Sequence, residues 1–266
     1  MNVALPVIFV SHGSPLFALN PGTTGPALHA WACDRAPASQ LKGILLMSPH
    51  WMTQGLSVMA GDAPATWHDF GGFPPEMYEL QYPAPGCPAL ALQVQHLLEP
   101  LGVKVTADAK RPFDHGAWVP LMHMYPQAQV PVVQLSLPAS ASLEQLHALG
   151  QALAPLREQG ILILASGSMT HNLYELRRVP GPPEPYVLEF CRWIENTLHA
   201  QDAQALFDYR NRAPHAERAH PTDEHFVTLF FALGAAGWGV HPGVEPDYIS
   251  HEVVYRTASM DAFSMG

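Results

Sequence analysis

The sequence predicts an α/β protein with a central, mostly parallel or mixed β-sheet flanked by helices. Two features of the hydrophobic pattern predict this fold. Short runs of aliphatic residues alternate along the chain with longer segments in which apolar residues recur at helical spacing. The short runs are almost continuously apolar, which is typical of strands covered on both faces. Because no Gly/Ser-rich linker or internal repeat divides the chain, we expect residues 1–266 to form a single domain.

The expected elements follow one another in this alternating order. Strands are predicted over residues 7–10, 43–47, 103–106, 132–137 and 161–165. Helices are predicted over residues 27–34, 89–98, 143–158, 185–199 and 223–233. Ser142 is a residue type that caps helix N-termini and precedes the third helix, and Gly160 follows its end. Gly234 is expected to terminate the fifth helix.

The longest stretch without such a pattern, residues 61–88, is rich in aromatic side chains. Loops of this length inside a compact domain are usually functional or disordered. The aromatic content favours an ordered segment. We therefore expect it to form a wall or lid over a pocket.

Composition and charge disfavour several classes of protein. The net charge is −10, from 13 basic and 23 acidic side chains without a basic run, which disfavours a nucleic-acid or anionic-membrane partner. The three cysteines share no C-x-x-C spacing, so a disulfide framework is not expected and a reducing cytoplasm fits best. Pro6 interrupts the first apolar stretch, which indicates a strand rather than a signal peptide. No apolar run approaches the ~18 residues of a membrane span. We expect a cytoplasmic monomer or small homo-oligomer.

Five histidines follow short apolar runs, each in a tight polar turn: His12, His50, His115, His171 and His225. Strand ends are where an open α/β sheet gathers its ligand-binding groups. Neutral imidazole is the commonest ligand for Zn, Cu, Fe and Ni, and it also transfers protons near neutral pH. The pattern therefore predicts a metal-centred active site.

Two of these histidines, His12 and His50, are expected at adjacent strand ends, where they could bind one metal ion from the same side. Each alone could equally cap its turn, but the pair favours ligation. For the third metal ligand, the sequence leaves two adjacent residues as alternatives. A two-His-one-carboxylate site would use Glu224, whereas the run of imidazoles points to His225. Adjacent helical residues point about 100° apart, so both can hardly serve.

The other two, His115 and His171, are candidates for proton transfer or oxyanion stabilisation. Asp114 and Asn172 are their chain neighbours and could fix the local loops. The structural alternative for each is a buried, hydrogen-bonded histidine. His68, in the aromatic stretch, is a further candidate. No nucleophile elbow, phosphate-binding loop or dinucleotide fingerprint is present.

Taken together, these segments resemble the DODA-type extradiol aromatic ring-opening dioxygenases of the class III extradiol superfamily. The resemblance extends from residue 8 to about residue 230. It rests on Ser11-His12-Gly13-Ser14-Pro15, Ser48-Pro49-His50-Trp51, Gly72-Phe73-Pro74, Tyr82-Pro83-Ala84-Pro85-Gly86, Asp114-His115-Gly116, Gln134-Leu135-Ser136, Thr170-His171-Asn172-Leu173 and His220-Pro221-Thr222-x-x-His225. One departure is Ser168, where the family pattern has Asn after Gly167.

The resemblance implies the class III extradiol dioxygenase fold and a single metal ion held by His12, His50 and His225, with histidine in place of the superfamily's carboxylate. It places His171 beside the metal, as a ligand in a resting form, and His115 as the acid/base. It also implies Fe(II) for activity, with Zn(II) able to occupy the same site.

The implied reaction inserts O2 into a catechol-type substrate, DOPA-like or otherwise substituted, and gives a muconic-semialdehyde-type product. Two alternatives remain. A zinc-dependent hydrolase would use the same imidazoles to activate water, and a non-catalytic binding module could use the same scaffold. Phe17, Trp51, Tyr78 and Trp118 could form an aromatic wall or pack the core, and the recognised motifs contain no Arg or Lys clamp for a substrate carboxylate.

Overall fold

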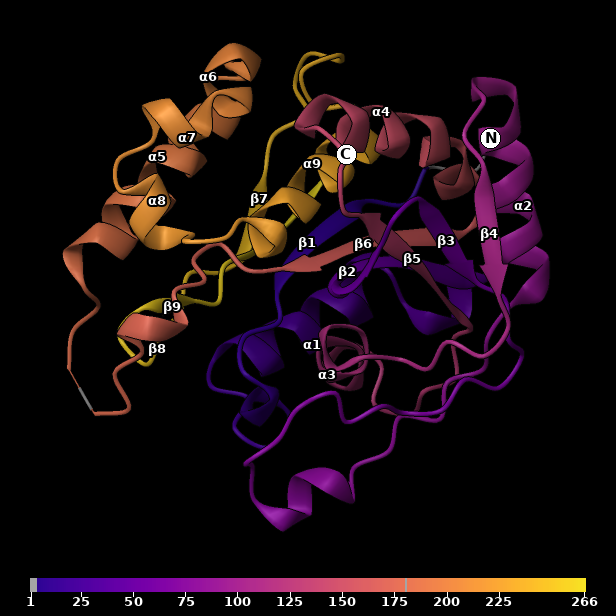
Figure 1. Ribbon diagram of the computed structural model, residues 1–266, viewed down its shortest axis with the longest axis horizontal. Helices are drawn as coiled ribbons and strands as arrows, with labels where there is room; N and C mark the ends of the chain where they lie inside the picture. Colours follow the sequence, from indigo (N-terminus) through magenta and orange to yellow (C-terminus); the bar gives the residue numbers. More distant parts are fainter. Residues whose placement is uncertain (1–3, 180) are drawn as a thin grey trace.

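The computed structural model describes residues 4–179 and 181–266, and within them eight strands form one mixed sheet with helices on both faces (Figure 1). The strands in this sheet run in the order β4-β3-β5-β2-β6-β1-β10-β7, and β8 and β9 form a separate small pair. Their bounds are β1 Val7–Ser11, β2 Gly43–Thr53, β3 Leu56–Met59, β4 Val105–Asp108, β5 Val132–Pro138, β6 Ile161–Gly167, β7 Asp247–Ser250, β8 Val253–Val254, β9 Ala258–Ser259 and β10 Ala262–Met265. The predicted α/β class with a mixed sheet is confirmed.

The parallel strands β5, β2, β6 and β1 form the centre of the sheet. Antiparallel pairing of β3 with β5, and of β10 with β1 and β7, makes the sheet mixed. All five predicted strands are present, but β4 starts two residues later than expected, because Gly102 first turns the chain with φ 70°. The short strands β3, β7 and β10 were not predicted, since their length gives too little periodicity to detect.

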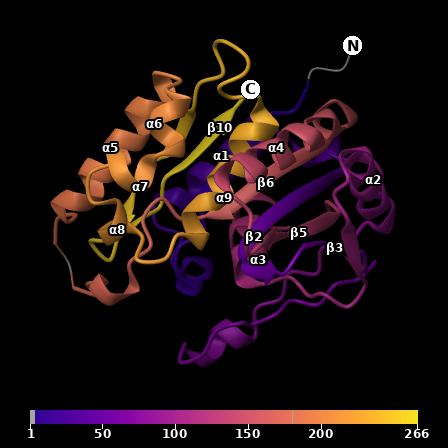
Figure 2. The same cartoon turned by 45° about the horizontal axis from the view of Figure 1, so that its top comes forward.

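The helices cover the two faces of the sheet in separate groups. Their bounds are α1 Thr24–Arg35, α2 Pro88–Leu98, α3 His115–Met124, α4 Leu143–Leu153, α5 Pro185–His199, α6 Ala203–Phe207, α7 Tyr209–Arg212, α8 Ala216–Ala219 and α9 Glu224–Ala236. Figures 1 and 2 show α1 and α3 on one face and α4 and α9 on the other, with α5 to α8 grouped at the opposite side of the molecule from α2. None of the described helices is both long and apolar enough to cross a bilayer.

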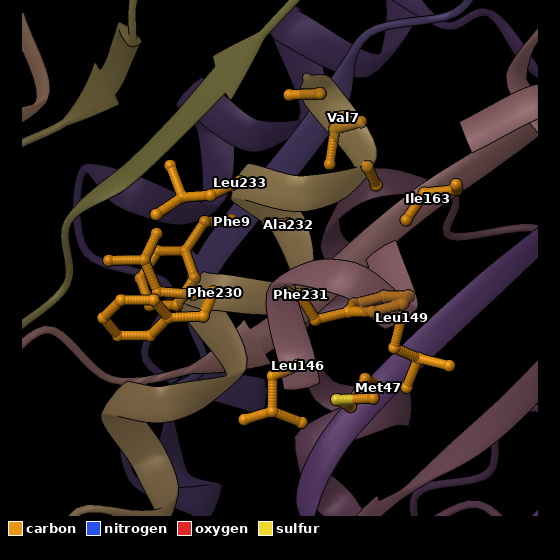
Figure 3. Packing of buried hydrophobic residues seen from close by; sticks show 14 of the residues in the cluster. Val7, Phe9, Met47, Leu146, Leu149, Ile163, Phe230, Phe231, Ala232 and Leu233 are labelled. Atoms are coloured by element: carbon orange, nitrogen blue, oxygen red, sulfur yellow. The ribbon is translucent and has the colours of Figure 1, made fainter. Parts of the chain in front are cut away.

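Alternation along each strand supplies both faces with core residues. In β1, Val7 and Phe9 pack toward α4 and α9, whereas Ile8 and Val10 pack toward α1 and α3. Figure 3 shows the first of these cores, in which Phe230 and other α9 side chains lie over the strands. Burial on both sides explains why the strands lack the apolar–polar alternation of a half-exposed sheet.

Three helix boundaries differ clearly from the prediction. α1 begins at Thr24 rather than at residue 27. α9 does not end before Gly234 but continues to Ala236. A Cβ at Gly234 would collide with the backbone carbonyl of His147, so this glycine allows α9 to approach α4 closely rather than ending the helix. α4 ends at Leu153, and a 3₁₀ helix over Ala154–Gln159 replaces its predicted last turn. The helix α3 was not predicted, because His115 was assigned to a turn.

Candidate active site

All five motif histidines line one cavity, with a volume of about 510 Å³, at the carboxyl ends of the central strands. His12 follows β1, and His171 lies in the loop after β6. His115 is the first residue of α3, and His225 is the second residue of α9. His50 lies within β2, where pairing with β5 breaks between Ser48 and Met52, so its backbone leaves the regular ladder. The sequence therefore identified residues that the fold brings together.

The route by which His12 and His50 meet differs from the prediction. Their strands are not adjacent, because β6 lies between β1 and β2. His12 reaches across β6 and contacts Ser166 in that strand, with its Nδ1 at 2.8 Å from Oγ. The side chains meet on the same side as expected, but a third strand supports them.

Three imidazole nitrogens converge at the base of the cavity. His50 Nε2 lies 3.0 Å from His12 Nε2 and 3.3 Å from His225 Nε2. Burial, together with the neighbouring imidazoles, lowers the pKa of His12 and His225 well below 6.5 and that of His50 to about 4. The three rings are therefore neutral near pH 7.

Hydrogen bonds behind two of the rings determine which nitrogen carries the proton. The hydroxyl of Ser166 donates to the Gly116 carbonyl at 2.5 Å, so its oxygen must accept from His12 Nδ1–H. His225 Nδ1–H donates to the Glu224 carboxylate at 2.8 Å. Both Nε2 atoms thus present lone pairs to the cluster. Three neutral, convergent Nε2 atoms, two of them in rings whose Nδ1–H is hydrogen-bonded, fit a transition-metal ion.

The same hydrogen bond bears on the choice between Glu224 and His225 as third ligand. Glu224 contacts the far nitrogen of His225, and the group of possible ligand atoms around His12 and His50 includes His225 but not Glu224. The geometry favours His225 as the ligand and Glu224 as the carboxylate that orients it.

The ring of His171 stacks on that of His225, with centroids 3.5 Å apart and planes 11° apart. Its possible ligand atom lies near those of Glu224 and His225, in a group that shares His225 with the group formed by His12 and His50. Burial lowers the pKa of His171. His171 therefore stands as a neutral side chain at the edge of the cluster.

A carboxylate from the aromatic stretch holds His115. Asp69 Oδ1 accepts from both the backbone N–H of His115, at 2.9 Å, and its Nδ1–H, at 3.0 Å. Burial is the largest single effect on the pKa of Asp69 and acts to raise it, but the hydrogen bonds and charge interactions with His115 and the charge interaction with His50 together lower it. In the neutral form of the ring, this bond places the proton on Nδ1 and leaves the lone pair of Nε2 facing away from Asp69. Sequence reasoning missed Asp69, although this acid in an aromatic loop was a signal that could have found it.

Asp114 and His68, two further candidates from the sequence, make structural contacts. Asp114, directly before His115, caps α3 and accepts from Arg111 at 2.7 Å and from Ser48 at 2.8 Å. His68 lies 3.0 Å from the Leu80 carbonyl through its Nε2 and does not line the cavity. Both stabilise the frame of the site.

Aromatic and aliphatic residues wall the cavity. Phe70 and Phe73 line it, which confirms that part of residues 61–88 forms a wall. Tyr255 is a further lining aromatic from the C-terminal region. None of the four aromatic residues named from the sequence lines the cavity. Phe17, Trp51 and Trp118 are buried in the core, and Tyr78 is exposed.

Burial of the neutral histidines predicts that the metal-free protein is less stable in acid. Between pH 6.5 and about 4 the unfolded chain binds a proton at His50 that the folded protein does not. Unfolding therefore takes up protons, and stability falls as pH falls through this window. We expect His50 alone to contribute a loss of ~3 kcal/mol.

Urea unfolding of the metal-free protein at pH 7 and pH 4.5 measures this loss. His50→Gln serves as the matched control and should show a shallower dependence. If the free energy of unfolding changed equally with pH in the two proteins, the lowered pKa of His50 would be contradicted.

The chain matches the family described as "Catalytic LigB subunit of aromatic ring-opening dioxygenase" over residues 6–260. It is 41% identical over 231 residues to a Beta vulgaris protein named 4,5-DOPA dioxygenase extradiol, covering 86% of each chain. An Escherichia coli K12 protein of the same name is 36% identical over 237 residues, covering 88% of this chain and 86% of that one. The crystal structure of an uncharacterized Escherichia coli K12 protein superposes with a TM-score of 0.77 at 28% identity, covering 98% of this chain and 100% of that one.

Proposed function

Because the chain belongs to the LigB family of aromatic ring-opening dioxygenases, we propose that it is an extradiol dioxygenase acting on a catechol-type substrate. The family resemblance inferred from the motifs is thereby confirmed. The observation that carries the proposal is the cluster of three Nε2 atoms with the protons of His12 and His225 donated outward. In this proposal His12, His50 and His225 hold the metal ion.

The family implies a metal site, and the three histidines could bind it. Its identity belongs to the proposal, which assigns Fe(II) to the active enzyme. When bound, Fe(II) supplies Lewis acidity toward the catecholate and a path for electrons between substrate and O2. The same imidazoles bind Zn(II) more tightly in the general affinity order, so Zn(II) can occupy the site in isolated protein.

The protein's own residues then handle protons and orientation. Nε2 of His115 accepts a proton from a catechol hydroxyl, while Asp69 holds the ring by its Nδ1–H. His171, neutral and at the cluster edge, stabilises charge that develops on oxygen. Phe70 and Phe73 line the cavity and would contact the aromatic ring of the substrate and exclude water from it.

The reaction is balanced without an external reductant. One O2 adds to one catechol. The ring bond between one hydroxyl-bearing carbon and its neighbour without a hydroxyl breaks, and both atoms of O2 remain in a muconic-semialdehyde-type product. The catechol supplies all the electrons. Neither the zinc hydrolase nor the binding module is favoured, because family and relatives are those of ring-opening dioxygenases.

Anaerobic loading with Fe(II), followed by O2 uptake with L-DOPA, caffeate, protocatechuate and catechol, tests the proposal. We expect consumption of one O2 per substrate and a yellow product, without hydrogen peroxide. Zn(II)-loaded protein is the matched control and should be inactive. Absence of uptake with every catechol, despite one Fe(II) per chain, would contradict the proposal.

A further inference from the structure

Among the described residues, one arginine or lysine side chain lines the cavity that holds the histidines. Arg178 lies in the segment after β6 and borders the cavity together with Leu173, Leu176 and Tyr255. It is exposed. Because the segment lies outside the histidine motifs, a search for an anion clamp within those motifs could not find it.

Arg178 is not committed to another partner in the part of the chain that the structure describes. Two other arginines in this part of the fold are paired: Arg218 lies 2.7 Å from Glu175, and Arg256 lies 2.6 Å from Glu184. Within residues 4–179 and 181–266, the Arg178 guanidinium makes neither an ion pair nor a side-chain hydrogen bond. Its donors are therefore available to a ligand.

The charge of the cavity wall indicates which kind of ligand Arg178 could bind. The described lining residues include the Arg178 guanidinium but no Asp or Glu side chain. Although the net charge of the chain is −10, this wall offers an anion one positive charge and no facing carboxylate. A guanidinium binds a carboxylate through paired, charge-assisted hydrogen bonds. A substrate ammonium group, by contrast, would find no lining carboxylate.

We propose that Arg178 is a specificity-determining residue that binds a carboxylate on the substrate's side chain. The preferred substrates are then catechols whose side chain carries a carboxylate and no ammonium group. The hydroxyls lie toward the histidines, and the side chain extends past Leu176 toward Arg178. This inference rests on the proposed catechol cleavage and names the substrate class within it.

Four catechols with similar side chains test the charge rule in the Fe(II)-loaded enzyme. They are dihydrocaffeate as the anion, L-DOPA as the zwitterion, 4-ethylcatechol as the neutral compound and dopamine as the cation. We expect kcat/KM to be highest for dihydrocaffeate and lowest for dopamine. The advantage of dihydrocaffeate should shrink as ionic strength rises, because Arg178 is exposed. Equal kcat/KM values for the anion and the cation would overturn the proposal.

Substitution assigns the selectivity to one residue. Arg178→Gln should lower kcat/KM for dihydrocaffeate about tenfold, chiefly through KM, and change that for 4-ethylcatechol less than about twofold. Arg178→Lys should recover part of the loss. Arg177→Gln is the matched control, since Arg177 is the adjacent exposed arginine and does not line the cavity. An equal loss with both substrates, or the same loss in the Arg177 variant, would overturn the assignment.

A binding measurement separates this inference from the activity itself. Titration calorimetry of dihydrocaffeate into Zn(II)-loaded protein under anaerobic conditions should show a Kd about tenfold higher in Arg178→Gln than in wild type. If this difference appears but no catechol is cleaved by the Fe(II)-loaded enzyme, catechol cleavage is contradicted while the anion site is supported. If catechols are cleaved but the Kd and the substrate ranking do not change, the Arg178 proposal alone is wrong.

Discussion

A His225→Ala variant is expected to lose metal binding, and His12→Ala to do the same. Each removes one of three convergent Nε2 donors. Structural metal sites bind with roughly 10–16 kcal/mol over four ligands, so one ligand contributes about 3 kcal/mol and its loss weakens affinity about 100- to 1,000-fold. Metal content after anaerobic Fe(II) loading and desalting should fall from one ion per chain to near zero. O2 uptake should fall to background.

The neighbouring carboxylate provides a matched control. Glu224→Gln keeps an acceptor for His225 Nδ1–H but removes the charge. Loss of such a supporting partner costs about 10- to 100-fold in affinity, so the variant should still load at high Fe(II) concentration. Circular dichroism of each variant reports whether the fold is intact. If Glu224→Gln lost the metal and His225→Ala retained it, the ligand assignment would be reversed.

The parts of this site that sequence could predict are those carried by local pattern. His12 follows an apolar strand and His225 lies at a helix start. The strand is visible as a continuous hydrophobic run and the helix as a periodic one. The helix α9 was misjudged at Gly234, because only the packed structure shows that this glycine serves contact with α4. The local pattern therefore located the ligand candidates better than the element ends.

The supporting residues lay beyond sequence reasoning for a different reason. Ser166 is 154 positions from His12, and Asp69 is 46 positions from His115. Nothing local marks either pair, because the fold alone creates the contact. Arg178 and Tyr255 reach the cavity in the same way, from segments without a recognisable motif. A residue type at a strand end can be read from the chain, whereas its hydrogen-bond partner requires the tertiary structure.

His115→Ala is expected to keep the metal and lose turnover. His115 is not one of the three residues His12, His50 and His225, although it forms another group of possible ligand atoms with His50 and Asp69. It lines the same cavity, and its Nε2 is the proton acceptor in the proposed reaction. General acid–base groups contribute about 10²- to 10⁴-fold, so kcat should fall within that range. Metal content should remain at the wild-type value. A full rate in this variant would contradict the acid/base role.

Asp69 should act through His115, and a double-mutant cycle can show it. Without Asp69, the ring of His115 is free to rotate and to carry its proton on Nε2, so Asp69→Ala should lower kcat about 10- to 100-fold with little change in KM. Adding the same change to His115→Ala should have almost no further effect, because the residue it orients is already absent. Asp69 Oδ2 also lies 3.9 Å from His50 Nδ1, which offers a different route through the metal. Additive losses in the double variant, together with weaker Fe(II) binding in Asp69→Ala, would identify that second route instead.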